Sequence, residues 1–469
     1  MRDRLKKVTR KGWIAASCWS ALYVAFIVWV AWDDAKSLWW LLLLPVIVDA
    51  FTTKVINWSW WKKYKGERLK VNGEGTEPNP DAKPWLYTIC SWVDAIVFAL
   101  VAVYFINLYM FQNYQIPSSS LEKSLRVGDF LFVSKMSYGA RVPNTPLSMP
   151  LMQHSWPAAF GGGKSYWDKP QWPYKRLRGW DTPKKGDIVV FNFPAGDTVC
   201  LKMQNPDYYT LCHYYGKQVV GTRKDVFGDI VVRPVDRREN YVKRCVGEPG
   251  DSLRVVDNVV YTKSKVESQK SKDEWMREPE REGIQLNYIV RTDGHILTRS
   301  YLDKLGVNHE DQHVIEPGIY HFPMTQAMRE NLAKNPHVLS IDVEPETAGG
   351  DVYPLGATTW TRDNYGPIYI PRKGDKLLIT EENYPIYRRI AQAYEHKPMK
   401  VGEEYEFAMD YYWMQGDNRH NSADSRYWGF VPEDHIVGRP VFIWLSIEKD
   451  KPWFKGHIRW NRLGKSASK

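Results

Sequence analysis

Long apolar segments near the N-terminus constrain the fold of this chain more than any other feature. Residues 14–32 carry no charged side chain and approach the roughly 20 residues that a helix needs to cross about 30 Å of hydrocarbon. Residues 38–56 form a weaker apolar segment because Asp49 lies inside it, and residues 86–110 form a third. We therefore predict a membrane anchor over residues 1–115, with three transmembrane helices at about residues 14–32, 38–56 and 86–110.

Basic residues are placed asymmetrically around these segments. Six lysines and arginines precede residue 14 and five lie between residues 62 and 70, whereas only Lys36 lies between the first two segments. The positive-inside rule places both basic stretches in the cytoplasm, the second segment across the membrane and everything after Tyr114 outside. The net charge of +10 is then mostly a matter of membrane topology, and we expect no nucleic-acid partner.

The cysteines show no metal-binding pattern. The chain has five cysteines, and no two of them have the Cys-x-x-Cys spacing of a zinc or redox site. Cys200 and Cys212 are close enough in sequence to form a disulfide in an oxidising compartment, and the sequence leaves this open. We predict no metal and no cofactor.

The first candidate for chemistry is a serine cluster directly after the last apolar segment. Residues 118–120 are three serines behind a proline, and Gly128-Asp129 marks a turn before a strand-like run at residues 130–133. The cluster therefore lies at the membrane edge of a folded domain. Taken alone, it is better explained as a flexible linker than as a nucleophile.

The remainder of the chain is rich in strand and turn patterns. Residues 185–194 combine a Gly-Asp turn with a β-branched run that a proline closes. Residues 252–256 and 259–261 form a hairpin pattern around Asp257-Asn258. Outside the apolar segments helical periodicity is scarce, and residues 325–335 and 381–394 are the candidate short helices.

The distribution of motifs suggests a domain plan. Residues 263–405 lack chemistry-bearing motifs and look inserted. We predict a β-rich catalytic core over residues 116–262 and 406–447, an inserted cap region over residues 263–405, and a basic C-terminal tail over residues 448–469.

The second candidate residue lies in a strand-like run at residues 240–246. Strand alternation puts Lys243 and Arg244 on opposite faces, so that one base can be buried and its neighbour solvated. A lysine serves as a general base only when neutral, and its ordinary pKa of about 10.4 must fall by several units, which burial in apolar surroundings can achieve. In isolation, an ordinary surface Lys-Arg pair would explain this segment better.

The third stretch, residues 416–429, packs hydroxyls, acids and arginines into a loop too polar to be buried without mutual hydrogen bonds. Asp424 and Arg426 are placed to pair locally, and Ser422 is placed to orient a neutral amine. Alternatively, the stretch is only a structural loop. His420 suggests a Ser-His-Asp triad, which we favour less because the other histidines are scattered.

In their order along the chain, these stretches resemble the bacterial type I signal peptidases, a family of membrane-bound Ser-Lys proteases. The resemblance implies N-terminal transmembrane helices followed by a mainly-β catalytic domain with a signal-peptidase-like β fold and an inserted cap. The matching stretches are the nucleophile box at residues 116–120, its continuation at 128–135, the Gly-Asp-Ile-Val-Val-Phe strand at 186–191, the base box at 241–251 and the last box at 416–429.

The chain also departs from the family pattern. Leu121 stands where the family usually has methionine, and Asp257-Asn258 replaces the usual Asn-Gly hairpin turn. Leucine keeps an apolar contact beside the nucleophile, so we expect activity to survive. Three spans also exceed the one or two that are commonest in the family.

The resemblance implies a role for each site residue. Ser120 would be the nucleophile and Lys243 the base, and the backbone N–H of Ser120 with the hydroxyl of Ser118 would form the oxyanion hole. The supporting residues would be Ser422, which would hydrogen-bond Lys243, the pair Asp424 and Arg426, which would hold the loop, and Arg244.

The implied activity is removal of N-terminal signal peptides from secreted preproteins at the outer face of the bacterial cytoplasmic membrane, with cleavage after small residues. The implied partners are preproteins, the lipid bilayer and, where substrate is delivered, the secretion translocon. Two alternatives stay open: a specialised Ser-Lys protease with a dedicated partner, and a degenerate binding or assembly protein.

Overall fold

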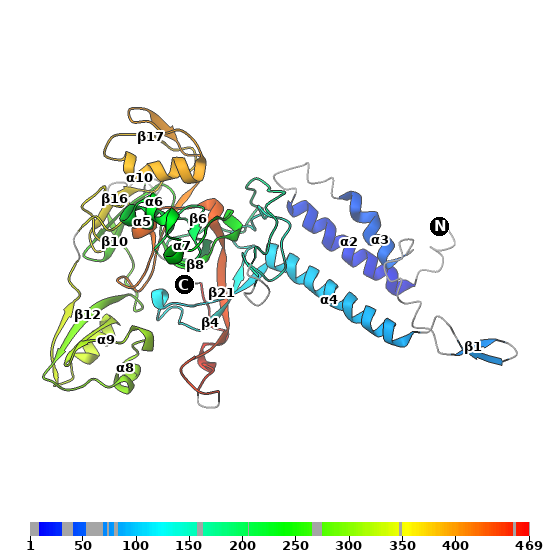
Figure 1. Cartoon of the computed structure of the whole chain (residues 1–469), viewed down its shortest axis with the longest axis horizontal. Helices are drawn as coiled ribbons and strands as arrows, with labels where there is room; N and C mark the ends of the chain where they lie inside the picture. Colours follow the sequence, from blue (N-terminus) through cyan, green and yellow to red (C-terminus); the bar gives the residue numbers. More distant parts are fainter. Residues whose placement is uncertain are drawn as a thin grey trace.

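The computed structural model shows a β-rich body from which long helices extend to one side (Figure 1). Helices α2 and α4 form most of this extension, and strand β1 lies at its far end. The structure describes residues 9–30, 41–52, 69–72, 75–78, 83–156, 163–204, 206–264, 274–346, 349–453 and 456–468.

Two of the described helices are long and apolar enough to cross a membrane. They are α2, Arg10–Val30, and α4, Pro84–Tyr109. The predicted second span is not confirmed, because α3, Leu44–Phe51, has eight residues and is about 12 Å long at a rise of about 1.5 Å per residue. Residues 38–40 and 53–56 of that predicted span lie outside the described residues. Three membrane crossings therefore stay a prediction.

Helices α2 and α4 run in the same direction. Near their C-terminal ends the rings of Phe26 and Tyr109 meet edge to face, with centroids 5.3 Å apart. The indole N–H of Trp29 donates a hydrogen bond to the carbonyl of Arg178 in the β-rich body, at 2.9 Å. Both helices thus end against this body and begin at the end remote from it (Figure 1).

A seven-stranded antiparallel sheet forms the centre of the body, with strand order β20-β19-β8-β5-β21-β4-β3. Strand β21 pairs first with β5 and then, past bulges, with β4, so the sheet curls. This confirms the mainly-β prediction. The strands are β3 Phe111–Gln115, β4 Asp129–Ser134, β5 Ile188–Asn192, β8 Asn240–Gly247, β19 Tyr411–Gln415, β20 Val431–Pro432 and β21 Ile436–Ser446.

Smaller sheets surround this centre. The predicted hairpin is confirmed: β9 pairs with β10 across Asp257 and Asn258, whose φ angles of 47° and 68° suit a two-residue turn. The smaller strands are β1 Leu69–Asn72, β2 Gly75–Pro78, β6 Thr198–Cys200, β7 Ile230–Val232, β9 Asp251–Val256, β10 Val259–Ser264, β11 Met276–Arg277, β12 Gln285–Thr292, β13 His313–Glu316, β14 Ile319–Thr325, β15 Val338–Val343, β16 Tyr365–Tyr369, β17 Lys376–Leu378 and β18 Glu404–Glu406.

Short helices are more frequent than predicted. Both candidate segments contain helix, as α9 and as α10 with η7, but a helical group between β6 and β7 was not predicted. Its members are too short for a helical period to be recognised. The short helices are α5 Tyr208–Tyr215, α6 Lys217–Thr222, α7 Lys224–Phe227, α8 Arg299–Leu305, α9 Gln326–Leu332, α10 Tyr384–Arg389, η7 Ile390–Glu395 and α11 Ser425–Trp428.

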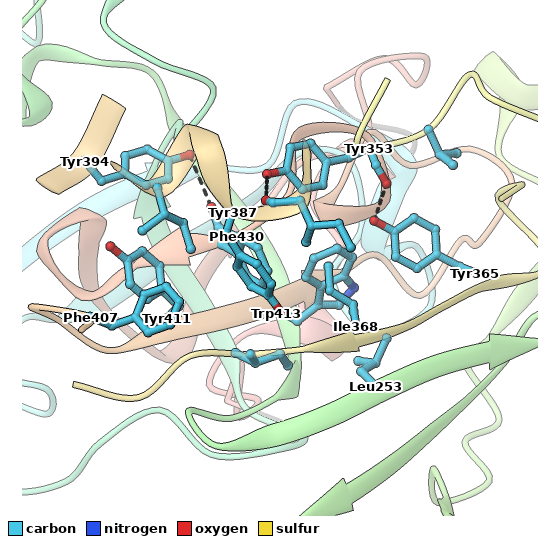
Figure 2. Packing of buried hydrophobic residues seen from close by; sticks show 14 of the residues in the cluster. Leu253, Tyr353, Tyr365, Ile368, Tyr387, Tyr394, Phe407, Tyr411, Trp413 and Phe430 are labelled. Carbon is cyan, nitrogen blue, oxygen red and sulfur yellow. Dashed lines mark hydrogen bonds between the residues drawn. The ribbon is translucent and has the colours of Figure 1, made fainter. Parts of the chain in front are cut away.

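An aromatic core joins the hairpin to the region after residue 350 (Figure 2). Trp413 and Phe430 pack edge to face, with centroids 5.6 Å apart, and Tyr387 stacks on Phe430 at 5.8 Å. Strand β16 also pairs with β9. Part of the predicted cap, residues 263–405, therefore shares a core with strands β9 and β19. The insertion is not confirmed as one unit.

A second part of the predicted cap has a core of its own. Strands β12 to β15 form a four-stranded sheet of order β13-β14-β12-β15, which packs with α8 and α9 around buried residues such as Phe322 and Leu332. We call residues 285–343 the four-stranded module. Figure 1 shows it at one corner of the body, away from α10 and β17.

The segment predicted as a basic C-terminal tail, residues 448–469, folds back onto the sheet. Ser466 forms an isolated β-bridge with Phe442 in β21. Ala467 is buried in the apolar cluster that also contains Ile116 and Leu121. The guanidinium of Arg462 donates to the buried carboxylate of Asp129, with 2.6 Å between Nη2 and Oδ2. An arginine in this basic segment thus has a structural partner in the Gly-Asp turn.

Candidate active site

The candidate nucleophile lies in a short turn after strand β3. Residues Ser119–Leu121 form the 3-10 turn η3, and Ile116 and Leu121 are buried in the same apolar cluster. The backbone of Ile116 also exchanges hydrogen bonds with the Gly128-Asp129 turn, at 2.9 and 3.0 Å. Burial before and after the serine thus fixes the position of Ser120, which is 8% exposed.

Lys243 reaches Ser120 from strand β8. Its Nζ lies 2.5 Å from the Oγ of Ser120, and the side chain is only 4% exposed. Burial lowers the pKa of Lys243 to about 8, against the opposing influence of the carboxylates of Asp424 and Asp417. A neutral amine in this position can accept the proton of the serine hydroxyl.

Asp424 and Arg426 form a buried ion pair behind the lysine. The Nε and Nη2 atoms of Arg426 donate to Oδ1 and Oδ2 of Asp424, at 2.9 and 2.8 Å. Burial alone would raise the pKa of Asp424, but the guanidinium outweighs it and the pKa is lowered. Asp424 also accepts from the N–H of Gly416, so its carboxylate links Arg426 to the backbone at the start of the loop at residues 416–429.

Arg244 differs from the prediction. Strand alternation suggested a solvated side chain, but Arg244 is buried, at 3% exposed. Its Nε and Nη2 donate to Oδ1 and Oδ2 of Asp417, at 2.8 and 2.7 Å. The hydroxyl of Ser124 joins the same carboxylate at 2.7 Å. Both faces of β8 are covered here because the loop at residues 416–429 closes over the face that was predicted to meet solvent.

Ser422 also differs from the prediction. Its hydroxyl is buried but forms no hydrogen bond with any residue in the described part of the chain, Lys243 included. It packs against Gly416 instead: a Cβ built on that glycine would lie 2.3 Å from the Oγ of Ser422 and 2.7 Å from the carbonyl oxygen of Ser120. Ser422 therefore fills space beside Gly416 and the carbonyl of Ser120 in this structure.

Ser118 and His420 have different surroundings in the structure. Ser118 is exposed, with an extended backbone, directly before η3. His420 bonds instead to groups on the strand side, with Nε2 3.0 Å from Oδ1 of Asn258 and 3.1 Å from Oδ1 of Asp363. Nζ of Lys243 is hydrogen-bonded to Oγ of Ser120, whereas Nδ1 of His420 accepts from the N–H of Asn287.

Two residues that sequence reasoning missed support the turn directly. The backbone N–H of Asn418 donates to the carbonyl of Ser120 at 3.0 Å, and its side-chain amide donates to the carbonyl of Ser119. Asp417 anchors Arg244, as described above. Both lie in the third stretch, and an acid near a basic residue in a buried strand could have suggested the ion pair.

No cluster of metal ligands occurs among the described residues. Residues 309–313 read His-Glu-Asp-Gln-His, a zinc-motif spacing that the prediction of no metal overlooked. That motif needs one helical face for both histidines, but here His309–Asp311 form a 3-10 turn and His313 begins strand β13.

Cys200 and Cys212 share a small buried cluster and are free thiols in this structure, so they form no disulfide here.

A cavity of about 500 Å³ lies beside strands β3 and β8, and its lining includes neither Ser120 nor Lys243. Tyr114 and Gln115 of β3 line it together with Asn240 of β8, and Tyr104 and Leu108 of α4 line its far side. Strand β3 ends the order of the main sheet. The cavity therefore lies between strands β3 and β8 and the C-terminal end of α4.

Comparison with known proteins identifies the family. The family model described as "Signal peptidase, peptidase S26" matches residues 89–310 and 369–445. Signal peptidase I of Buchnera aphidicola subsp. Acyrthosiphon pisum (strain APS) is 24% identical over 366 residues, which cover 78% of this chain and 77% of that protein. Signal peptidase I of Helicobacter pylori (strain ATCC 700392 / 26695) is 24% identical over 395 residues, 81% of this chain and 93% of that protein.

A third relative, signal peptidase I of Haemophilus influenzae (strain ATCC 51907 / DSM 11121 / KW20 / Rd), is 24% identical over 377 residues, 78% of this chain and 72% of that protein. The family match spans the serine turn, strand β8 and the loop at residues 416–429. The chain therefore belongs to the bacterial type I signal peptidase family, and it is a serine peptidase.

Proposed function

We propose that this protein removes N-terminal signal peptides from preproteins with Ser120 as nucleophile and Lys243 as general base. The observation that carries the proposal is the 2.5 Å contact between Nζ of Lys243 and Oγ of Ser120. Both side chains are buried, and the lysine pKa is lowered to about 8. A lysine with this pKa is partly neutral near physiological pH, as a general base must be.

The chemistry follows from this contact. Neutral Lys243 takes the hydroxyl proton as Oγ of Ser120 attacks the scissile carbonyl, and the resulting ammonium returns the proton to the leaving amine. Water then enters and gives a proton to Lys243 as its oxygen attacks the acyl carbon. The bond between that carbon and Oγ of Ser120 breaks, and the ammonium of Lys243 returns the proton to Oγ. The Asp424–Arg426 pair and the packing of Gly416 against Ser422 hold the loop that closes over the base.

The oxyanion that develops during attack needs donors in place beforehand. The backbone N–H of Ser120 and the hydroxyl of Ser118 are the candidates, because Ser120 lies within the turn η3, Ser118 directly precedes it, and Ser118 is exposed. Loss of one such donor typically costs about 10²- to 10³-fold in kcat.

The substrate would bind in an extended conformation along β3. This strand ends the sheet order among the described elements and leads directly into the serine turn, so its free edge suits β-augmentation. The cavity of about 500 Å³ beside Gln115 and Asn240 would hold residues before the scissile bond. Its lining by α4 supports entry of the signal peptide from the membrane side.

The directions of the helices bear on the number of membrane crossings, and the basic residues before α2 and at residues 62–70 support a catalytic domain on the outer face of the cytoplasmic membrane. If α2 and α4 both cross the bilayer, their shared direction requires the chain between them to cross back. The segment that includes α3 would make this return, which gives the three crossings and the multi-pass topology that the positive-inside rule predicts. Lipid and a secretion translocon would then be partners.

The decisive experiment is cleavage of a synthetic preprotein by the purified, detergent-solubilised full chain, followed by sequencing of the new N-terminus. We expect one cut after small residues at the first and third positions before the bond, and loss of that cut in Ser120→Ala and Lys243→Ala. Cleavage that persists in both variants would refute the proposed dyad.

A further inference from the structure

The loop before β13 in the four-stranded module contacts the turn η3 at Ser119–Leu121, which we call the serine turn. Among its contacts, the hydroxyl of Ser119 donates to Oδ1 of Asp311 at 3.1 Å. The side-chain amide of Asn421 donates to the same Oδ1 at 2.7 Å and to Oγ of Ser119 at 3.3 Å. Ser119 and Asp311 are both buried, at 7% and 6% exposed.

We propose that Asp311 is a positioning residue for the nucleophile: it fixes Ser119 and thereby the orientation of Ser120. The inference rests on the proposed function, because it assigns a role around the proposed nucleophile. Ser119 and Ser120 share the one turn η3, so a rotation of the peptide at Ser119 moves Oγ of Ser120 away from Lys243. Asp311 acts through its neighbour and does not touch the reacting atoms.

Two further contacts of the same loop support this role. The amide of Asn308 donates to the buried carboxylate of Glu122 at 3.2 Å, and Nζ of Lys123 donates to the carbonyl of Gly306. Lys123 has a φ of 78°, a conformation that non-glycine residues adopt at a cost. A turn with this backbone needs an external support, and residues 306–311 provide one.

The family match does not account for Asp311. It ends at residue 310 and resumes at residue 369, so Asp311 lies directly outside the matched residues. The histidines on either side of Asp311 bind elsewhere or face outward: Nε2 of His309 lies 3.4 Å from Nη1 of Arg299, and His313 is exposed. The carboxylate of Asp311 is thus the group of this motif that faces the active site.

The hydrogen-bond pattern predicts which substitution is tolerated. Oδ1 of Asp311 accepts both hydrogen bonds, whereas Oδ2 accepts none from the described residues. Asp311→Asn keeps an acceptor for Ser119 and Asn421, so it should retain activity within about threefold. Asp311→Ala removes the acceptor and should lower kcat about tenfold or more, with KM within about twofold.

The experiment measures kcat and KM of the full chain in detergent with a fluorogenic preprotein peptide. Asp342→Ala is the matched control, because Asp342 lies on β15 of the same module in an exposed pair with Arg291. It should behave as wild type. Equal losses in Asp311→Ala and Asp311→Asn, or wild-type kcat in Asp311→Ala, would overturn the positioning role.

Amide hydrogen exchange gives a readout that does not depend on catalysis. In a Ser120→Ala background, Asp311→Ala should speed exchange of residues 116–125, whereas Asp311→Asn and Asp342→Ala should not. If the dyad itself were wrong, Ser120→Ala and Lys243→Ala would keep activity while this exchange result still tested the contact. Unchanged exchange in Asp311→Ala would overturn the contact itself.

If Asp311→Ala folds poorly, Ser119→Ala tests the same hydrogen bond by removing its donor. It should also lower kcat, and the double variant Ser119→Ala/Asp311→Asn should be no worse than Ser119→Ala alone. A Ser119→Ala enzyme with wild-type kcat would overturn the proposal.

Discussion

Arg244 and Asp417 form a buried bidentate ion pair one strand position after Lys243, with both N···O distances below 2.9 Å. This pair joins β8 to the loop at residues 416–429. It also reaches the segment that follows the serine turn, because Nη2 of Arg244 lies 3.0 Å from Oγ of Ser124. Three segments that are distant in sequence therefore meet at one guanidinium.

Asp417→Ala should lower the free energy of unfolding by about 3–5 kcal/mol, because it leaves a buried guanidinium without its partner. Asp342→Ala breaks an exposed ion pair with Arg291 and should cost less than about 1 kcal/mol. Thermal or denaturant unfolding in detergent compares the two. Similar losses for both variants would show that the Arg244–Asp417 pair is not effectively buried.

Gly416→Ala should impair catalysis more than stability. The new Cβ would lie 2.3 Å from Oγ of Ser422 and 2.7 Å from the carbonyl oxygen of Ser120, so it should displace the serine turn and lower kcat about tenfold or more. Gly221→Ala is the matched control, since a Cβ there meets open space in helix α6. That control should keep full activity, and equal effects would contradict this account.

The sequence predicted several local elements around the site because the patterns that specify them are local. The Gly-Asp turn, the β5 strand and the hairpin at Asp257-Asn258 each follow from residues that are adjacent in sequence. The meeting of Ser120 with Lys243 followed only from the family resemblance, since no pattern of period or spacing brings residues 120 and 243 together.

What the sequence could not predict depends on contacts between distant segments. Asp311 and Ser119 are 192 positions apart, and their contact depends on how the four-stranded module is placed. Arg244 is buried because a loop more than 170 positions away covers it. The C-terminal segment was predicted to be a tail because its lysines and arginines are typical of a solvated segment, yet Arg462 pairs with Asp129.

Membrane topology can be tested with single cysteines in a variant without native thiols. A cysteine at Asn72, between α3 and α4, should be protected from an impermeant thiol reagent on intact cells, whereas one at Ile296, exposed in the four-stranded module, should react. Detergent lysis should make both reactive and serves as the control. Labelling at position 72 but not at 296 would reverse the proposed topology.

Lys243→Met should stabilise the folded protein at neutral pH while abolishing activity. The folded-state pKa of Lys243, about 8, lies below its ordinary value of 10.5, so folding disfavours the charged lysine. This cost is complete below pH 8, declines between pH 8 and 10.5 and is absent above. After allowance for the lost hydrogen bond to Ser120, Lys243→Met should raise the free energy of unfolding by about 2 kcal/mol at pH 7. Unfolding midpoints at pH 7 and pH 10 should show this gain shrinking.

The pH dependence of catalysis distinguishes a lysine base from a histidine base. Since neutral Lys243 is the reactive form, kcat/KM should rise with pH through an apparent pKa of about 8. Lys243→Arg should be inactive because arginine stays protonated. Ser120→Ala and Lys243→Ala remove members of one proton-transfer unit, so the double variant should be scarcely worse than either single variant.

His420→Gln is the matched control for this mechanism. Glutamine can still donate to Oδ1 of Asn258, as Nε2 of His420 can, so the variant should retain most activity and the same pH profile. A histidine base would give the opposite pattern, with Lys243→Arg active and His420→Gln dead. In that case the lysine mechanism would be wrong, although the protein would still be a serine peptidase of this family.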